Sequence, residues 1–241
     1  MPVAALAVLI AEHQPCVVLT GAGMSTESGI PDFRSPTGLW ADVDPFEVAS
    51  IQAFRRDPLR VWGFYRTRIK ALLDAAPNDG HRALADLERR GFVQAVVTQN
   101  IDLLHARAGS QDVIEVHGSI GSAVCPACGH EDDLDAVLAQ LDERPAPRCS
   151  GCGAVLKPGV TLFGELLPAA AMDRATEFSR GADLMLVVGS SLEVWPVAGL
   201  PLEARRLAIV NRGPTALDGR AMLKIDAPAG ETLAALVDAL A

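Results

Sequence analysis

The sequence lacks a long hydrophobic run, an excess of basic charge and internal repeats. No stretch reaches the roughly 18 consecutive apolar residues of a membrane-spanning helix, so we expect no membrane insertion. The formal net charge of −9 argues against general binding to nucleic acid or to an anionic membrane. Hydrophobic residues make up 49% of the 241 residues, which is typical of a globular protein. We therefore expect a globular protein that binds neither nucleic acid nor membrane.

Cysteine is also scarce, and its arrangement is informative. Four of the five cysteines form two close pairs, whereas Cys16 lies alone in an apolar stretch. This pattern suits a metal site in a reducing compartment better than a disulfide framework. The apolar run at residues 3–10 has no basic segment before it and is followed by Glu12 and His13, so it predicts a core-packed helix rather than a secretory signal. We expect a cytoplasmic monomer.

Short apolar runs alternate with helical patterns along the chain. The runs that we expect to be strands are residues 16–19, 93–98, 113–116, 184–188 and 207–210. This alternation predicts an α/β fold with a parallel sheet that helices cover on both faces. Glycine and polar residues follow the strands, at residues 21–34, 98–105, 117–118 and 189–191. Any one of these loops could be an ordinary turn. Together they indicate a ligand site at the carboxyl ends of the strands.

Composition divides the chain into three parts. Residues 119–157 contain four cysteines, several prolines and glycines and a charged stretch, and predict a small zinc-ribbon domain. Residues 44–78 are helical in pattern and relatively rich in aromatic residues, and predict a helical insert. The domain built on the parallel sheet is expected to comprise residues 1–43, 79–118 and 158–241.

The two cysteine pairs have the spacing of a zinc ribbon. Cys125 and Cys128 are separated by two residues, as are Cys149 and Cys152, twenty residues further on. A pair of disulfides or a metal-free knuckle is the alternative. Four thiolates would complete the tetrahedral shell of zinc and leave no position for water. We therefore expect one structural zinc ion rather than a catalytic one.

A glycine-rich loop follows the first predicted strand. Gly21, Ala22, Gly23 and Ser25 would let backbone amides approach a diphosphate closely. The next glycine, Gly29, comes too late for the G-x-G-x-x-G dinucleotide fingerprint. The loop alone is therefore weak evidence for a nucleotide site.

Several motifs together closely resemble the sirtuin family. These are GAGMS at residues 21–25, GIPDFR at 29–34, TQNIDLLH at 98–105, HG at 117–118, the four cysteines, FGE at 163–165, GSS at 189–191 and Asn211. The resemblance spans nearly the whole chain. It implies a Rossmann-like domain with a small zinc-binding domain, and NAD as a consumed co-substrate. It also implies an NAD-dependent protein lysine deacylase, which acts on acylated lysine side chains and releases nicotinamide and O-acyl-ADP-ribose.

The resemblance assigns catalytic roles to three residues. His117 matches the family's general base, and histidine is the side chain that titrates nearest neutral pH. Asn100 and Asp102 are expected to hold the nicotinamide ribose and the carboxamide. Both also precede a helical run, so helix capping is the alternative for each. The other histidines near these motifs, such as His81 and His105, are expected to cap or pack.

The resemblance also implies a set of residues that bind the cofactor. They are Gly21, Ala22, Gly23, Ser25, Asp32, Phe33, Arg34, Gln99, Asn100, Ile101, Asp102, Gly189, Ser190, Ser191, Asn211, Arg212 and Ala229. Asp32 and Phe33 are expected to line the nicotinamide pocket, and Arg34 to help fix the loop. Ser190 replaces the usual threonine of the family but keeps the hydroxyl group.

The expected substrate-binding residues come from two regions. They are Ala49, Tyr65, Arg68, Val160, Leu162, Phe163, Gly164, Glu165 and Val194. An extended substrate would lie between residues 160–165 and 192–194 by strand addition, with its acyl-lysine pointing inward. Main-chain bonds would supply most of the affinity, so selectivity for flanking residues should be weak.

Tyr65 and Arg68 bear on the choice of acyl group. They are three residues apart on a predicted helix and share a face. With Ala49, they resemble the sirtuin branch that removes succinyl and malonyl groups, because a guanidinium and a phenol can bind a carboxylate. The alternative is that Tyr65 belongs to the core and Arg68 is solvated. Asp32 and residues 192–194 look more like other branches, so the expected substrates are acetyl-lysine, acidic acyl-lysine or both.

Two other functions use the same cofactor pocket. A mono-ADP-ribosyltransferase would transfer the nucleotide to a different acceptor, and a non-catalytic module would only sense NAD. The presence of His117 and of the peptide-binding segment favours deacylation.

Overall fold

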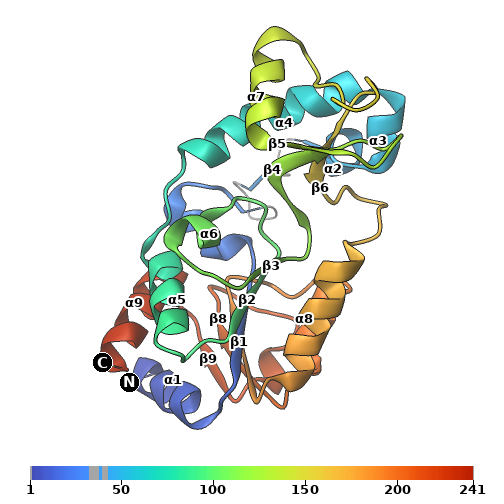
Figure 1. Ribbon diagram of the computed structural model, residues 1–241. Coiled ribbons are helices and arrows are strands. Elements are labelled where there is room, and N and C mark those ends of the chain that lie inside the picture. Colours follow the sequence, from blue (N-terminus) through green and yellow to red (C-terminus); the bar gives the residue numbers. More distant parts are fainter. Residues whose placement is uncertain (1, 33–37, 40–42, 241) are drawn as a thin grey trace.

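The computed structural model describes residues 2–32, 38–39 and 43–240. Figure 1 shows a larger lobe built on a parallel sheet and a smaller lobe above the carboxyl ends of its strands. The two termini lie close together on the larger lobe, far from the junction of the lobes.

Six parallel strands form the sheet of the larger lobe. In spatial order they are β3 (Val113–Glu115), β2 (Ala95–Thr98), β1 (Cys16–Thr20), β7 (Leu184–Val188), β8 (Arg206–Val210) and β9 (Leu223–Ile225). The chain runs outward in both directions from β1 and β7, which places a switch point between these two strands. All five strands expected from the sequence are present. The short edge strand β9 was not anticipated, because Lys224 interrupts its apolar pattern.

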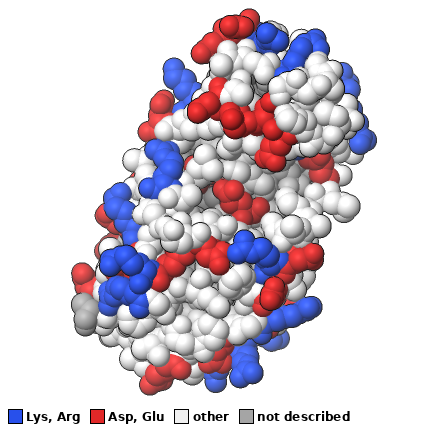
Figure 2. Space-filling view, in the orientation of Figure 1, with Lys and Arg blue, Asp and Glu red and all other residues white. Residues whose placement is uncertain are grey.

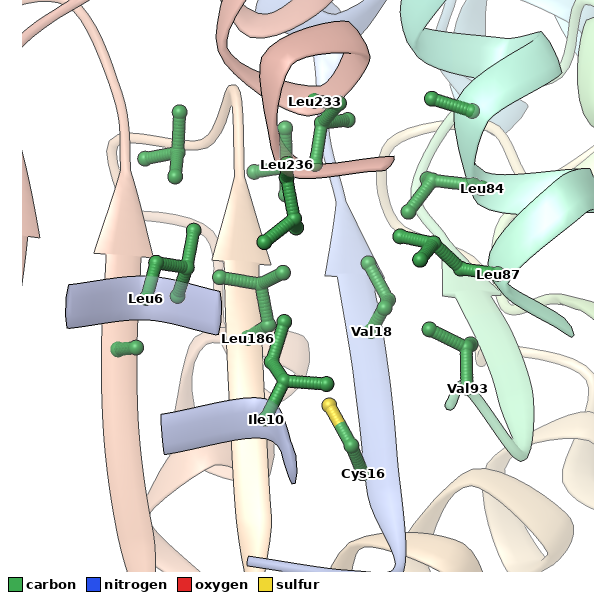
Figure 3. Close-up of a cluster of buried hydrophobic side chains, with 14 of the residues drawn as sticks. Leu6, Ile10, Cys16, Val18, Leu84, Leu87, Val93, Leu186, Leu233 and Leu236 are labelled. Atoms are coloured by element: carbon green, nitrogen blue, oxygen red, sulfur yellow. The ribbon is translucent and has the colours of Figure 1, made fainter. Parts of the chain in front are cut away.

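Helices cover both faces of this sheet, as the sequence predicts. Helices α1 (Pro2–Glu12), α5 (Asp79–Arg89) and α9 (Ala229–Ala239) lie on one face, and α8 (Ala169–Gly181) lies on the other (Figure 1). Every residue of β1 and β7 is buried, because both faces are covered. Figure 3 shows side chains of α1, α5 and α9 meeting those of β1 and β7. Cys16 lies in this core, where burial raises the pKa of its thiol to about 12.

The smaller lobe contains the zinc-ribbon domain and the helical insert. Its antiparallel sheet has the order β5 (Glu131–Asp133), β4 (Gly118–Val124), β6 (Lys157–Val160), and α7 (Leu134–Glu143) packs on it. The insert forms α2 (Pro45–Val48), α3 (Ile51–Arg56) and α4 (Pro58–Asp74). Ser50 accepts a bond from the Ala53 N–H at the start of α3, and Asp57 does so from Arg60 at the start of α4. These two polar caps explain why one helical stretch is divided into three helices.

The insert packs on the zinc ribbon rather than on the large sheet. Trp62 of α4 is fully buried, and its indole Nε1 donates a 2.7 Å hydrogen bond to the carbonyl of Leu156. Residues of α3 and α4 form one hydrophobic cluster with residues beside the metal-binding cysteines, including Cys125 and Cys149. The two segments therefore stabilise each other, whereas their exact domain boundaries stay predictions.

The surface carries both signs of charge. On the face drawn in Figure 2, basic side chains are interspersed with acidic ones, and acidic side chains gather on the smaller lobe. Among the described residues, no helix combines the length and the apolar character needed to cross a membrane.

Candidate active site

The loop after β1 crosses the loop after β7 in direct contact. The Gly21 N–H donates to the Val188 carbonyl at 3.1 Å, and the Gly23 N–H donates to the Gly189 carbonyl at 2.9 Å. A Cβ on Gly23 would lie 2.9 Å from the Gly189 Cα. Gly189 has a φ of +63°, and a Cβ there would lie 2.3 Å from the Met24 nitrogen. These positions require glycine because two backbones meet at the switch point of the sheet.

A buried polar network joins this loop to the loop after β2. The Ser25 Oγ donates to the Asp102 Oδ2 at 2.6 Å. The Asn100 Nδ2 lies 3.1 Å from both the Gly21 carbonyl and the Ser25 Oγ. Asp102 Oδ1 also accepts from the Leu104 N–H at 2.9 Å, in the first turn of α6 (Leu104–Ala108). Capping therefore explains part of the environment of Asp102 but none of that of Asn100, whose amide holds the glycine-rich loop.

His117 lies just past the end of β3, and one of its ring nitrogens is already hydrogen-bonded. Its Nδ1 lies 2.9 Å from the carbonyl of Gln99, which can only accept, so Nδ1 carries the proton. In the neutral ring Nε2 is therefore free to act as a base. Burial lowers the pKa of His117, and the hydrogen bond to Gln99 partly opposes that shift. The next residue, Gly118, has a φ of +72°, and a Cβ there would lie 2.3 Å from the Gly159 carbonyl.

Two further histidines lie behind this network. The His81 Nδ1 accepts from the Asn78 N–H at 3.3 Å in a capping box at the start of α5. The His105 Nε2 lies 2.9 Å from the Thr20 Oγ1, and the two imidazole rings are 4.8 Å apart. Burial lowers the pKa of His81 to about 4 and that of His105 to about 3. Both cap or pack, as expected, and both are neutral at pH 7.

The loops after β7 and β8 complete the cofactor side of the site. The Gln99 Nε2 donates to the Ser190 Oγ at 2.9 Å. Asn211 is buried at the end of β8, and its Nδ2 donates to the carbonyls of Arg212 and Gly213. Ser191 follows Ser190 at the end of β7, and Ala229 is the first residue of α9.

Glu27 joins the loop after β1 to α9 through a contact that the sequence did not reveal. Its Oε1 accepts a 2.8 Å hydrogen bond from the Gly230 N–H, at the amino end of α9. An anion at this position is stabilised by the free N–H groups of the helix. The partner lies 203 positions away in the sequence, so no local pattern could have indicated the contact.

Not every predicted cofactor residue can be placed. Phe33 and Arg34 lie outside the described residues. Asp32 is described and its carbonyl accepts from the Leu39 N–H at 2.7 Å. Ile101 is partly buried beside the network and packs against the hydrophobic cluster of the smaller lobe.

The predicted substrate segment links the catalytic strand to the helical insert. The Thr161 N–H donates to the His117 carbonyl at 2.7 Å. The Phe163 N–H donates to the Ala49 carbonyl at 2.8 Å, and its carbonyl accepts from Ile51 at 3.0 Å. The side chains of Val160 and Leu162 are buried in the core, so they do not face a substrate that lies along this segment. Val194 lies half-buried in the loop after β7.

Arg68 has an unusual environment on α4. Its guanidinium carbon lies 4.0 Å from the centre of the Phe64 ring, and its Nε is buried without a hydrogen-bond partner. Within the described part of the chain, no carboxylate forms an ion pair with it. The neighbouring Tyr65 is buried in the core, as expected if it serves the packing of the protein. Burial raises the pKa of its phenol. Arg68 itself is partly exposed, although its Nε is buried.

The four paired cysteines meet at one point of the smaller lobe. Their Sγ atoms all lie within 4.8 Å of one another, with 3.5 Å between Cys125 and Cys152 and 3.6 Å between Cys128 and Cys149. A zinc ion with bonds of about 2.3 Å separates its thiolates by roughly 3.8 Å. The separations exceed the S–S bond of about 2.05 Å, so the disulfide alternative is not formed.

This donor set fits a structural zinc ion. The Gly151 N–H donates to the Cys149 Sγ at 3.3 Å, and His130 bonds to the Ser150 Oγ at 2.9 Å instead of joining the cluster. Four thiolates fill the tetrahedral shell, so the prediction of a structural rather than catalytic ion is confirmed.

Comparison with known proteins agrees with this geometry. The sequence profile described as the Sir2 family matches residues 21–196. This chain belongs to the Sir2 family, the sirtuins. It is 45% identical over 235 residues to NAD-dependent protein deacylase 2 of Archaeoglobus fulgidus, covering 95% of this sirtuin and 92% of that protein. It is 50% identical over 218 residues to NAD-dependent protein deacetylase 1 of Geobacillus kaustophilus, covering 87% and 86%.

Solved sirtuin structures share the whole fold. A Sir2 enzyme structure that is 43% identical superposes with a TM-score of 0.91, covering 99% of this sirtuin and 97% of that chain. A Sir2 structure with a p53 peptide and NAD+ is 38% identical and has a TM-score of 0.90, covering 99% and 98%. The Rossmann-like fold and the zinc ribbon predicted from the sequence are therefore confirmed.

Proposed function

We propose that this sirtuin is an NAD-dependent protein lysine deacylase whose acyl pocket favours acidic acyl groups such as succinyl. The observation that supports deacylation is that Asn100 and Asp102 bond to the glycine-rich loop at the switch point of the sheet, while His117 bonds to the carbonyl of the neighbouring Gln99. The names of the relatives, and the solved family complex with a peptide and NAD+, support the same reaction.

The residues of the site have separable tasks in this proposal. Bound NAD supplies an electrophilic ribose carbon, and nicotinamide and O-acyl-ADP-ribose are released. Asn100 and Asp102 hold the ribose and carboxamide end of the pocket, and Ser25 fixes the carboxylate of Asp102. Gln99 fixes the tautomer of His117, which leaves Nε2 to take a proton from a ribose hydroxyl. The lowered pKa of His117 keeps this nitrogen unprotonated at neutral pH.

The environment of Arg68 supports the acidic-acyl part of the proposal. A guanidinium group with a buried, unbonded Nε is costly unless an anion or a hydrogen-bond acceptor joins it. An acyl carboxylate is planar and can accept two parallel N–H bonds from a guanidinium group. The raised pKa of Tyr65 keeps its hydroxyl protonated and able to donate to the same carboxylate. An acetyl group offers no such acceptor.

The test compares one lysine peptide carrying either an acetyl or a succinyl group. Deacylation is followed by mass spectrometry for the wild type, Arg68→Met and the matched control Arg66→Met. Arg66 lies two positions away on the same helix and is exposed. We expect the wild type to prefer succinyl, and Arg68→Met to lose about 10–100-fold of kcat/KM for that peptide, the range for one charged hydrogen-bonding group. Arg66→Met should match the wild type.

Two results would contradict the proposal in different ways. A preference for acetyl that Arg68→Met leaves unchanged would refute the acidic-acyl pocket but not deacylation. Stable ADP-ribose on protein, with no loss of acyl-lysine, would instead favour the mono-ADP-ribosyltransferase. Failure of every acyl peptide to release nicotinamide would favour a module that only senses NAD.

A further inference from the structure

Lys157, at the start of β6, forms an ion pair and hydrogen bonds with residues of the substrate segment. The Lys157 Nζ lies 3.0 Å from the Glu165 Oε2. It also donates to the carbonyl of Val160 at 2.7 Å and to that of Pro158 at 3.0 Å. Only 12% of the Lys157 side chain and 21% of the Glu165 side chain are exposed. The ammonium group thus has three acceptors in a largely desolvated position.

The same carboxylate closes the turn that presents the substrate segment. The Glu165 Oε2 accepts a 2.8 Å hydrogen bond from the Leu162 N–H, and the Glu165 N–H donates to the Leu162 carbonyl at 3.0 Å. Gly164, inside the turn, has a φ of +86°, and a Cβ there would lie 3.0 Å from the Gln52 side chain. The conformation of the turn is therefore held by one carboxylate on one side and by the insert on the other.

We propose that Lys157 is a positioning residue for the acyl-lysine substrate, which holds the Glu165 turn and neutralises the Glu165 carboxylate beside the acyl pocket. The inference rests on the proposed deacylase function, because it assumes that the substrate lies along this segment.

The contacts of the turn explain why its position matters. Phe163 is hydrogen-bonded on both sides to the insert, through Ala49 and Ile51, and Thr161 is bonded to the carbonyl of His117. The backbone that would pair with an extended peptide is therefore continuous with both the acyl pocket and the base. Without Lys157, the Val160 carbonyl loses a donor and the Glu165 carboxylate is left largely buried without its cation. The turn can then relax toward water and misplace the peptide.

The charge of Glu165 also bears on the acyl group. Glu165 and Arg68 both act on the Tyr65 phenol, with opposite effects: Glu165 raises its pKa and Arg68 lowers it. An unpaired carboxylate in this neighbourhood would attract Arg68 and repel an acidic acyl chain. Its pairing with Lys157 weakens both effects, which leaves the Arg68 guanidinium for the substrate.

The experiment measures steady-state constants of the zinc-loaded enzyme for acetyl and succinyl peptides and for NAD. The variants are Lys157→Met, Lys157→Arg, Glu165→Gln and Lys157→Met with Glu165→Gln. The control is Arg180→Met. Arg180 lies on the distant helix α8, is exposed, and pairs with Glu203 at 2.9 Å. Zinc content and thermal unfolding are measured for each protein.

We expect Lys157→Met to raise the peptide KM about 10-fold, as loss of one charged hydrogen bond does, while the KM for NAD changes less than about twofold. The preference for succinyl over acetyl should fall in Lys157→Met and recover in the double variant, which has no unpaired carboxylate. Lys157→Arg should restore the peptide KM to within about threefold, because it keeps the cation. Arg180→Met should match the wild type.

The proposal is overturned if Lys157→Met leaves the peptide KM unchanged or raises the KM for NAD equally. If Lys157→Met loses zinc or does not fold, the peptide KM of Glu165→Gln tests the proposal instead. That variant keeps Lys157 and its two carbonyl acceptors. An unchanged peptide KM in Glu165→Gln then overturns the proposal, and a raised one supports it. A wild-type protein inactive on every acyl peptide would refute the deacylase function instead.

Discussion

Mild acid should destabilise this sirtuin through two buried histidines. His81 and His105 are 0% and 2% exposed, and their rings face each other at 4.8 Å. Burial lowers the pKa of His81 to about 4, with Asp102 opposing the shift and Arg82 adding to it. Burial also lowers the pKa of His105 to about 3, and His81 adds to that shift. Both rings are therefore neutral in the folded protein above about pH 5.

The sign and size of the effect follow from the difference in bound protons. In the unfolded chain both imidazoles have a pKa near 6.5, so between pH 6.5 and pH 4 the unfolded state binds more protons. The stabilisation is fully present above pH 6.5 and is lost as the pH falls. Each histidine costs about 1.4 kcal/mol per pH unit below 6.5, or roughly 2 kcal/mol at pH 5. Together they should lower the free energy of unfolding by about 4 kcal/mol.

The assay is urea unfolding of the zinc-loaded protein at several pH values between 7.5 and 5. His105→Gln removes one of the two titrating rings and should roughly halve the dependence on pH. Arg66→Met alters an exposed side chain that does not titrate in this range and should leave that dependence unchanged. A free energy of unfolding that is flat over this range, or a slope that His105→Gln does not reduce, would refute the reasoning.

Four further outcomes are expected. A strong zinc chelator should remove the near-ultraviolet circular dichroism signal of Trp62, because α4 shares its core with the cysteine cluster, while most far-ultraviolet helix signal remains. Gly189→Ala should lower the free energy of unfolding by about 3 kcal/mol or more in urea titrations, since its Cβ would meet the Met24 nitrogen at 2.3 Å. Trp62→Phe should cost about 1–3 kcal/mol in the same assay, because a buried carbonyl loses its donor. The pH profile of kcat/KM should lose activity toward acid with a midpoint below 6.5, because burial lowers the pKa of the His117 base; a midpoint above 6.5 would contradict that assignment.

The sequence by itself determined the type of fold and the chemistry of the two sites. Apolar runs that alternate with helices can only be buried as a covered parallel sheet, and polar residues after those runs must gather at one edge of it. The cysteine spacing fixed the metal site because each pair lies within one tight turn. Such signals are local, so they can be seen without the folded chain.

The tertiary structure decided the contacts between distant segments. The bond from Glu27 to Gly230, the shared core of α4 and the zinc ribbon, and the pairing of Lys157 with the Glu165 turn each join different elements. The burial of the Arg68 Nε likewise depends on what packs over α4, because helical spacing shows which residues share a face but not what covers it. Burial and ion pairing depend on contacts between residues that are far apart in the sequence. A single sequence does not show which distant residue will contact a given side chain.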